Sequence, residues 1–263
     1  MGILNITDNS FFSDSRCIKD NGDFSVDDIL SKVELFVNEG VDILDIGACS
    51  TRPGSFAVGA DAEWSRLSKV LVPIKSEFKN LKISVDTYWA SVVEKTYDLI
   101  GDFIVNDISA GEDDSSMLSV VGRLGLDYIA MHKRGNSHTM QSLCDYEDVS
   151  KDVYKYFENF TLLAEEAGIK NWILDPGFGF AKTVDQNYEL LRNLDIFTKF
   201  NKKILVGLSR KSMIYKYLDI TPEESLSETQ VLNMKALEMG ADILRVHDVE
   251  AAKRTIKLYR KLA

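Results

Sequence analysis

Eight short apolar runs are spread along this 263-residue chain, and each stops at a polar side chain that can do chemistry. The runs are residues 2–4, 41–46, 83–85, 103–105, 128–131, 172–174, 204–206 and 243–244. Parallel strands that are buried on both faces have this unbroken apolar character. A (β/α)8 barrel builds its site at the C-terminal ends of such strands. A buried core explains the apolar residues, but it does not explain why polar residues end every run.

Helical patterns fill the segments between the runs, most clearly at residues 26–37, 64–78, 149–167 and 249–262. Ser25 and Asp28 resemble a capping box, Gly168 stands where a C′ glycine is expected, and Pro73 should kink or divide its helix. Strand then helix, eight times over, predicts a parallel sheet with helices outside. We therefore expect an α/β fold, a (β/α)8 TIM barrel, with residues 1–263 as a single domain.

Composition excludes several classes of protein. The formal net charge is −10 and no basic stripe is visible, which argues against a nucleic-acid partner. No stretch approaches the 18 apolar residues of a membrane span, and the first twelve residues lack the regions of a secretory signal. The three cysteines show no metal or disulfide spacing. We expect a cytoplasmic protein that binds small molecules.

Three connections after strands are long, at residues 7–23, 48–60 and 133–145. They are rich in Ser, Asp, Asn and Gly. Long loops in compact domains are usually functional or disordered. Because all three lie on the side of the barrel where ligands bind, we interpret them as lids over the site.

Four residues at strand ends offer a mixed donor and acceptor lining: Asp86, Asn106, Asp175 and Lys211. Carboxylates can accept paired N–H bonds and a lysine can donate to a carbonyl oxygen, so this lining suits a heterocycle with an amino–amide edge. The glycines that follow Asp175 permit a flat ligand to approach the backbone closely. A single strand-end carboxylate is as often a helix cap, so the interpretation depends on the four together.

Cations gather after the last two strands. Arg210 and Lys211 follow the seventh run, and Arg245 and His247 stand two residues apart after the eighth. Phosphate sites of TIM barrels commonly form after strands seven and eight, so this group predicts an anion site. The alternative is solvated charges with one arginine that bridges to a helix.

Two further residues have weaker individual signals. Asn5 ends the first run, and an amide oxygen beside a diphosphate can be a Mg²⁺ ligand. Arg52 precedes a proline in a loop, where it can reach a carboxylate or phosphate. For His132 and His138 we favour ordinary hydrogen bonds. Neither a Ser-His-Asp arrangement nor a zinc cluster stands out, which indicates a site that binds and positions its substrates.

These residues, in this order, resemble the dihydropteroate synthase family of folate biosynthesis. The matching segments are Met1–Thr7, Ser50–Gly54, Ile83–Asp86, Asn106–Asp107, Met131–His132, Asp175–Phe180, Ser209–Ser212 and Arg245–Val249. They span nearly the whole chain. Each segment is modest alone, but eight in the same order make the resemblance specific.

The resemblance implies a transferase that joins 7,8-dihydropterin-6-ylmethyl diphosphate to 4-aminobenzoate, giving 7,8-dihydropteroate and diphosphate. It also implies Mg²⁺ as a cofactor, a sulfonamide target and a homodimer. The implied pterin residues are Asp86, Asn106, Asp175 and Lys211, and the implied diphosphate residues are Thr51, Arg245 and His247. Asn5 is implied for Mg²⁺, and Arg52, Phe180 and Ser212 for the aminobenzoate. Lys211, Arg245, His247 and Asp86 are expected to carry the catalysis.

The first loop departs from the family pattern, because Asp8 and Asn9 stand where proline and aspartate are usual. This departure keeps open a non-catalytic or weakly active paralogue that binds pterin. A second alternative is the pterin-binding methyltransferase domain of cobalamin-dependent enzymes, which would not need Lys211, Arg245 and His247 beside an asparagine. A barrel with unrelated phosphate chemistry is the remaining possibility.

Overall fold

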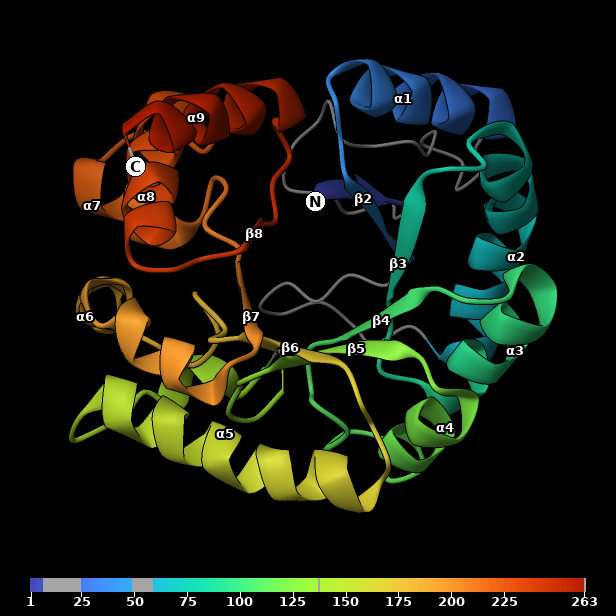
Figure 1. The fold of residues 1–263 in the computed structure, drawn as a ribbon. Helices are drawn as coiled ribbons and strands as arrows, with labels where there is room; N and C mark the ends of the chain where they lie inside the picture. The colour runs from blue at the N-terminus through green and yellow to red at the C-terminus, as the bar shows by residue number, and fades with distance from the viewer. Residues whose placement is uncertain (7–24, 49–58, 137, 263) are drawn as a thin grey trace.

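A computed structural model describes residues 1–6, 25–48, 59–136 and 138–262. Its strands form one parallel eight-stranded sheet in the order β1 to β8 (Figure 1). The strands are β1 Gly2–Asn5, β2 Ile43–Gly47, β3 Lys82–Asp86, β4 Ile104–Asp107, β5 Asp127–Met131, β6 Trp172–Asp175, β7 Lys203–Val206 and β8 Ile243–Leu244. A parallel bridge between Gly2 and Val246 joins the two edges. The predicted (β/α)8 TIM barrel is confirmed.

The helices surround the strands on the outside (Figure 1). They are α1 Val26–Asn38, α2 Ala60–Glu77, α3 Ala90–Ile100, α4 Met117–Leu124, α5 Val149–Glu166, α6 Val184–Arg192, α7 Ser212–Leu218, α8 Leu226–Glu238 and α9 Val249–Leu262, with 3-10 helices η2 Met140–Ser142 and η3 Leu194–Phe200. Two helices, α7 and α8, connect β7 to β8. None of the helices in the described ranges is long and apolar enough to cross a membrane.

Alternation along the strands gives the molecule two apolar cores. Five buried residues form a small inner cluster: Met1, Ile104, Ile129, Ile173 and Leu205. A much larger cluster lies between the sheet and the helices. Because successive strand residues point to opposite faces, the residues two positions after the inner cluster lie in the next layer toward the C-terminal ends. Two of them are polar: Asn106, which follows Ile104, and Asp175, which follows Ile173.

The predicted helix ends are confirmed where side chains or glycine define them. The Ser25 side chain accepts a hydrogen bond from the Asp28 backbone N–H at the start of α1. Gly168 has φ +74° directly after the C-cap of α5, a conformation that glycine adopts without strain. Of the two effects expected of Pro73, a divided helix is wrong, because α2 runs through it, and a kink stays a prediction. Leu67, Val70, Leu71 and Ile74 are buried along α2, and this packing outweighs the single backbone bond that the proline removes.

Candidate active site

A row of polar residues crosses the C-terminal ends of the first four strands. The register aligns Asn5 with Gly47, Gly47 with Asp86, and Asp86 with Asn106. A Cβ placed on Gly47 would lie 3.6 Å from Asn5 Oδ1 and 3.7 Å from Asp86 Oδ2. Because Gly47 has no side chain, the space between the Asn5 amide and the Asp86 carboxylate stays open.

Arg245 reaches across the barrel to two carboxylates. Its Nη2 lies 2.8 Å from Asp86 Oδ2, and its Nε donates to Asp45 Oδ2 at 2.7 Å. The sequence interpretation assigned Arg245 to the anion and Asp86 to the heterocycle as separate groups. The structure instead joins them in one ion pair, because Arg245 leaves its backbone directly after the short strand β8 and extends over the barrel mouth. Burial raises the pKa of the Asp86 carboxyl, and Arg245 opposes that rise.

Asp45 is a site residue that the sequence interpretation missed. It is fully buried within β2 and bonds to Arg245, to Ser84 Oγ at 2.7 Å and to Asn106 Nδ2 at 3.1 Å. The signal that identifies it is an acidic residue flanked by apolar ones inside the run Ile43–Ile46. A buried charge requires such partners, and this requirement predicts a network although not its members.

The turn after β6 brings Asp175, Phe180 and Lys211 together. Asp175 Oδ1 accepts the Gly177 N–H at 2.8 Å, and Lys211 Nζ donates to the Phe178 carbonyl. Lys211 Nζ also lies 5.1 Å from the centre of the Phe180 ring, a cation–π contact. Burial raises the pKa of the Asp175 carboxyl and lowers that of the Lys211 ammonium to about 8.

Lys182 is the second site residue that the sequence interpretation missed. It is buried, and its ammonium donates to the carbonyls of Gly177 at 2.9 Å and Phe180 at 3.0 Å. Its Nζ is also 3.0 Å from Nδ1 of His132, which confirms the hydrogen-bonding interpretation of that histidine. Burial lowers the pKa of Lys182 to about 7. This lysine therefore fixes the turn that carries Asp175 and Phe180.

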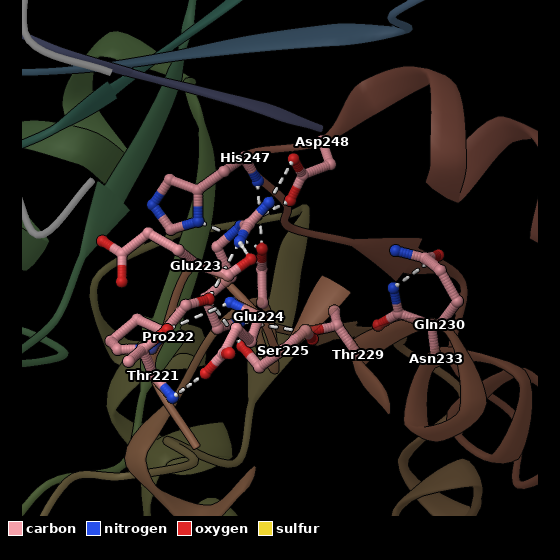
Figure 2. Close-up of polar contacts among 12 residues, drawn as sticks. Thr221, Pro222, Glu223, Glu224, Ser225, Thr229, Gln230, Asn233, His247 and Asp248 are labelled. Carbon is pink, nitrogen blue, oxygen red and sulfur yellow. Dashed lines mark hydrogen bonds and ion pairs between the residues drawn. The ribbon is translucent and has the colours of Figure 1, made fainter. Parts of the chain in front are cut away.

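The two cations after β7, Arg210 and Lys211, have different partners. Arg210 makes two bonds of 2.9 Å to Asp248 and further bonds of 2.8 Å to the carbonyls of Pro222 and Glu223; Figure 2 labels these three partners. For Arg210 the alternative of an arginine that bridges to a helix is therefore right, since Asp248 directly precedes α9. Lys211 remains at the site, and Ser212 begins α7 beside it.

His247 faces Ser209 at the end of β7. Its Nδ1 lies 3.0 Å from Ser209 Oγ, and its backbone N–H donates to the same hydroxyl (Figure 2). Burial and then the charge of Arg245 lower the pKa of His247 to about 4. The imidazole is therefore neutral at pH 7, and a neutral imidazole still carries one N–H donor.

Some predicted residues lie outside the described ranges. These are Thr51 and Arg52, with most of the first two long connections. The third connection is described apart from residue 137, and Gln186 on α6 donates to the Cys144 carbonyl within it at 2.8 Å. Its function as a lid stays a prediction.

The chain is similar in sequence to a family of pterin-binding enzymes. A family model described as "Pterin binding enzyme" matches residues 1–247. The chain is 39% identical to dihydropteroate synthase of Escherichia coli K12 over 263 residues, which covers 99% of this chain and 89% of the relative. It is 38% identical to dihydropteroate synthase of Haemophilus influenzae, with coverage of 100% and 93%.

Solved structures agree with the sequence relatives. A Yersinia pestis dihydropteroate synthase in a sulfonamide drug complex superposes with a TM-score of 0.92 at 32% identity, covering 99% of this chain and 92% of that one. A Thermus thermophilus dihydropteroate synthase in complex with 4-aminobenzoate gives a TM-score of 0.86 at 32% identity, covering 100% and 93%. A Coxiella burnetii dihydropteroate synthase with pteroic acid gives 0.87 at 31% identity, covering 99% and 91%.

Proposed function

This chain belongs to the pterin-binding enzyme family, among the dihydropteroate synthases, and from that premise we propose that it condenses 7,8-dihydropterin-6-ylmethyl diphosphate with 4-aminobenzoate. The products are 7,8-dihydropteroate and diphosphate. The observation that carries the proposal is the gathering of Asp86, Asn106, Asp175, Lys211 and Arg245 at the C-terminal ends of the barrel strands. Such a set of acceptors beside two cations matches a pterin that carries an anionic leaving group.

The pterin is proposed to lie against Asp86, Asn106, Asp175 and Lys211. Both carboxylates and the amide present acceptors for the N–H groups of the ring, and the Lys211 ammonium offers a donor to its carbonyl oxygen. Gly179 has φ +84°, and a Cβ there would lie 3.4 Å from Lys211 Cδ. A side chain at Gly179 would therefore touch the proposed pterin lysine, and the positive φ would strain its backbone.

The diphosphate is proposed to lie against Arg245, His247 and Thr51. The Arg245 bonds to Asp45 and Asp86 use its Nε and Nη2, and none of the described residues accepts a bond from its Nη1. That donor and a neutral His247 are available to phosphate oxygens at physiological pH. This local pair is needed because the chain as a whole is acidic and repels anions.

The residues at the first strand end fit a magnesium ion. Asn5 offers an amide oxygen beside Gly47, with a carboxylate oxygen of Asp86 on the other side of the same opening. Mg²⁺ prefers oxygen ligands, takes few from protein and completes its shell with water and phosphate. When bound there it would neutralise charge on the diphosphate. Among the described residues no group of three or more His, Cys, Asp or Glu side chains could hold a metal.

The aminobenzoate is proposed to stack near Phe180, with Ser212 and Arg52 toward its carboxylate. The reaction breaks the methylene C–O bond, and the diphosphate leaves with the electron pair. The amine nitrogen then bonds to the pterin methylene cation and releases its proton to solvent. The protein contributes position and charge stabilisation, without a covalent intermediate on a side chain.

An assay of diphosphate release tests this function. Purified protein is incubated with the pterin diphosphate and Mg²⁺, with and without 4-aminobenzoate. Release that depends on the arylamine, with dihydropteroate as the product, supports the synthase. Tight pterin binding in calorimetry without release would instead support the weakly active paralogue and contradict the proposal.

We also propose a homodimer, a cytoplasmic location and inhibition by sulfonamides at the aminobenzoate position. For the dimer, large apolar side chains on the outer faces of α7, α8 and α9 are exposed, namely Tyr217, Val231, Leu258 and Leu262. Exposed apolar surface is a common feature of association surfaces. Light scattering of the purified protein measures the mass, and a value near the 29.6 kDa of one chain would contradict the dimer.

A further inference from the structure

Asp45 has no part in the proposed binding of either substrate. It lies two residues before the end of β2, one layer below Gly47 in the row of strand-end residues, and none of its surface is exposed. Its neighbours along the strand, Leu44 and Ile46, are buried in the outer core. A carboxylate in such a place is stable only when hydrogen bonds and opposite charge replace its water.

Donors from three separate parts of the barrel surround the Asp45 carboxylate. Ser84 Oγ donates to Oδ1 at 2.7 Å, and Asn106 Nδ2 lies 3.3 Å from Oδ1 and 3.1 Å from Oδ2. Arg245 Nε donates to Oδ2 at 2.7 Å. Both carboxylate oxygens of Asp45 thus accept hydrogen bonds from these donors, and a carboxylate oxygen has no hydrogen to give in return.

This restriction determines the orientation of Asn106. Its side chain has one donor end and one acceptor end, and only the donor end can face Asp45. The amide oxygen of Asn106 therefore turns away from Asp45. No hydrogen bond from the described part of the chain reaches that oxygen, so it is the atom of Asn106 that a ligand meets.

We propose that Asp45 is a positioning and specificity-determining residue. By holding the amide nitrogen of Asn106, it presents the amide oxygen to the substrate and thereby selects a ligand edge that donates N–H. A flipped amide would present a donor at the same place and would repel that edge. The inference rests on the proposed function, because the donating edge is that of a pterin.

The test replaces Asp45 with its isosteric amide and measures the binding of pteroic acid by calorimetry. Asp45→Asn can offer a donor to Asn106 and so permits the flip. We expect the affinity for pteroic acid to fall about 10- to 100-fold. Asp42→Asn is the matched control, because Asp42 lies directly before the start of β2, is exposed and contacts Lys253. The control should bind as the wild type does.

A double-mutant cycle separates this role from a merely structural one. In the Asn106→Ala background the orientation of the amide no longer matters, so Asp45→Asn should change the affinity less than about 3-fold. A loss that stays the same in both backgrounds would mean that Asp45 acts only on Arg245 or on the fold, and it would overturn the proposal. An Asp45→Asn protein that binds as well as the wild type would also overturn it.

A measurement on the wild type covers the case in which Asp45→Asn does not fold. In asparagine-labelled protein, the Nδ2 protons of Asn106 should keep their Asp45-bonded chemical shifts when pteroic acid binds. Shifts that show transfer of this donor to the ligand would contradict the orientation. If the wild type binds no pteroic acid, the proposed function fails, whereas equal binding by wild type and Asp45→Asn rejects the present inference alone.

Discussion

Arg245 Nη2 lies 2.8 Å from Asp86 Oδ2, although the two residues are 159 positions apart in the chain. The proposed diphosphate residue and a proposed pterin residue thus form one ion pair before either substrate arrives. The two halves of the same substrate are expected to bind on either side of this pair. Since Nη1 of Arg245 remains for the anion, the pair does not have to break when the substrate binds.

Asp175→Asn is expected to weaken pterin binding about 10- to 100-fold, because one acceptor for the N–H edge becomes a donor. Titration calorimetry with pteroic acid measures the change. Asp185→Asn on the exposed start of α6 is a matched control and should leave the affinity unchanged. An unchanged affinity in Asp175→Asn would show that the ring lies elsewhere.

The strands and the ring of polar ends were predictable from the sequence. A buried parallel strand has a continuous apolar run, so Ile83–Val85 and Trp172–Leu174 locate β3 and β6 with little ambiguity. The barrel geometry then places Asp86 and Asp175 at one mouth. These inferences depend on local pattern and on a topology with few solutions.

The pairings within the site were not predictable in the same way. Asp45 and Arg245 are 200 positions apart, and their contact depends on side-chain directions across a closed sheet. Arg210 and Lys211 are neighbours in sequence, yet one turns to Asp248 and the other to Phe178, because Arg210 has φ +54°. A sequence pattern predicts on which face of a strand or helix a residue lies. The partner that its side chain contacts depends on the tertiary structure around it.

Turnover is expected to fall as pH rises through about 8, because the Lys211 ammonium then loses the proton that we propose it donates to the ring. Turnover falls with rising pH because burial lowers the Lys211 pKa to about 8, and the protonated form expected to be active exists only below that pH. Lys211→Arg should keep its charge and move the falling limb of kcat/KM to higher pH. Lys211→Ala should lose about 100-fold or more of the turnover, while exposed Lys216→Ala on α7 should not. A limb that stays near pH 8 in Lys211→Arg would assign it to another group.

Asn5→Ala is expected to raise the Mg²⁺ concentration needed for half-maximal rate by about tenfold, since the proposed amide ligand of the ion is lost. Initial rates across a Mg²⁺ titration measure this. Asn38→Ala at the exposed end of α1 removes an equivalent amide away from the site and serves as the control. An unchanged Mg²⁺ dependence in Asn5→Ala would show that the ligand assignment is wrong.

Gly177→Ala is expected to lower the free energy of unfolding by about 3 kcal/mol or more. Gly177 has φ +72°, and an added Cβ would lie 1.9 Å from the His132 carbonyl oxygen. Gly168→Ala is a matched control, because its φ is +74° but nothing lies within 4 Å of the added atom. The control should cost only the backbone strain of about 1–2 kcal/mol. Equal losses in urea denaturation would mean that the turn after β6 moves aside without cost.

Glu63→Gln is expected to stabilise the protein, and more so at pH 8 than at pH 5. Glu63 is fully buried on α2, and burial raises its pKa from 4.5 to about 8. The folded state therefore holds a proton that the unfolded state releases above pH 4.5, so the stability of the wild type falls as pH rises from about 5 to 8. Glutamine carries no such penalty, and we expect a gain on the order of 1–3 kcal/mol at pH 8.

Urea denaturation at both pH values measures the Glu63→Gln gain. The exposed Glu77→Gln at the end of α2 makes the same chemical change without burial and should alter stability little at either pH. A gain that is equal at pH 5 and pH 8 would show that the Glu63 carboxyl does not retain its proton in the fold. Glu63 would then be a further ionised carboxylate whose charge acts on Asp86.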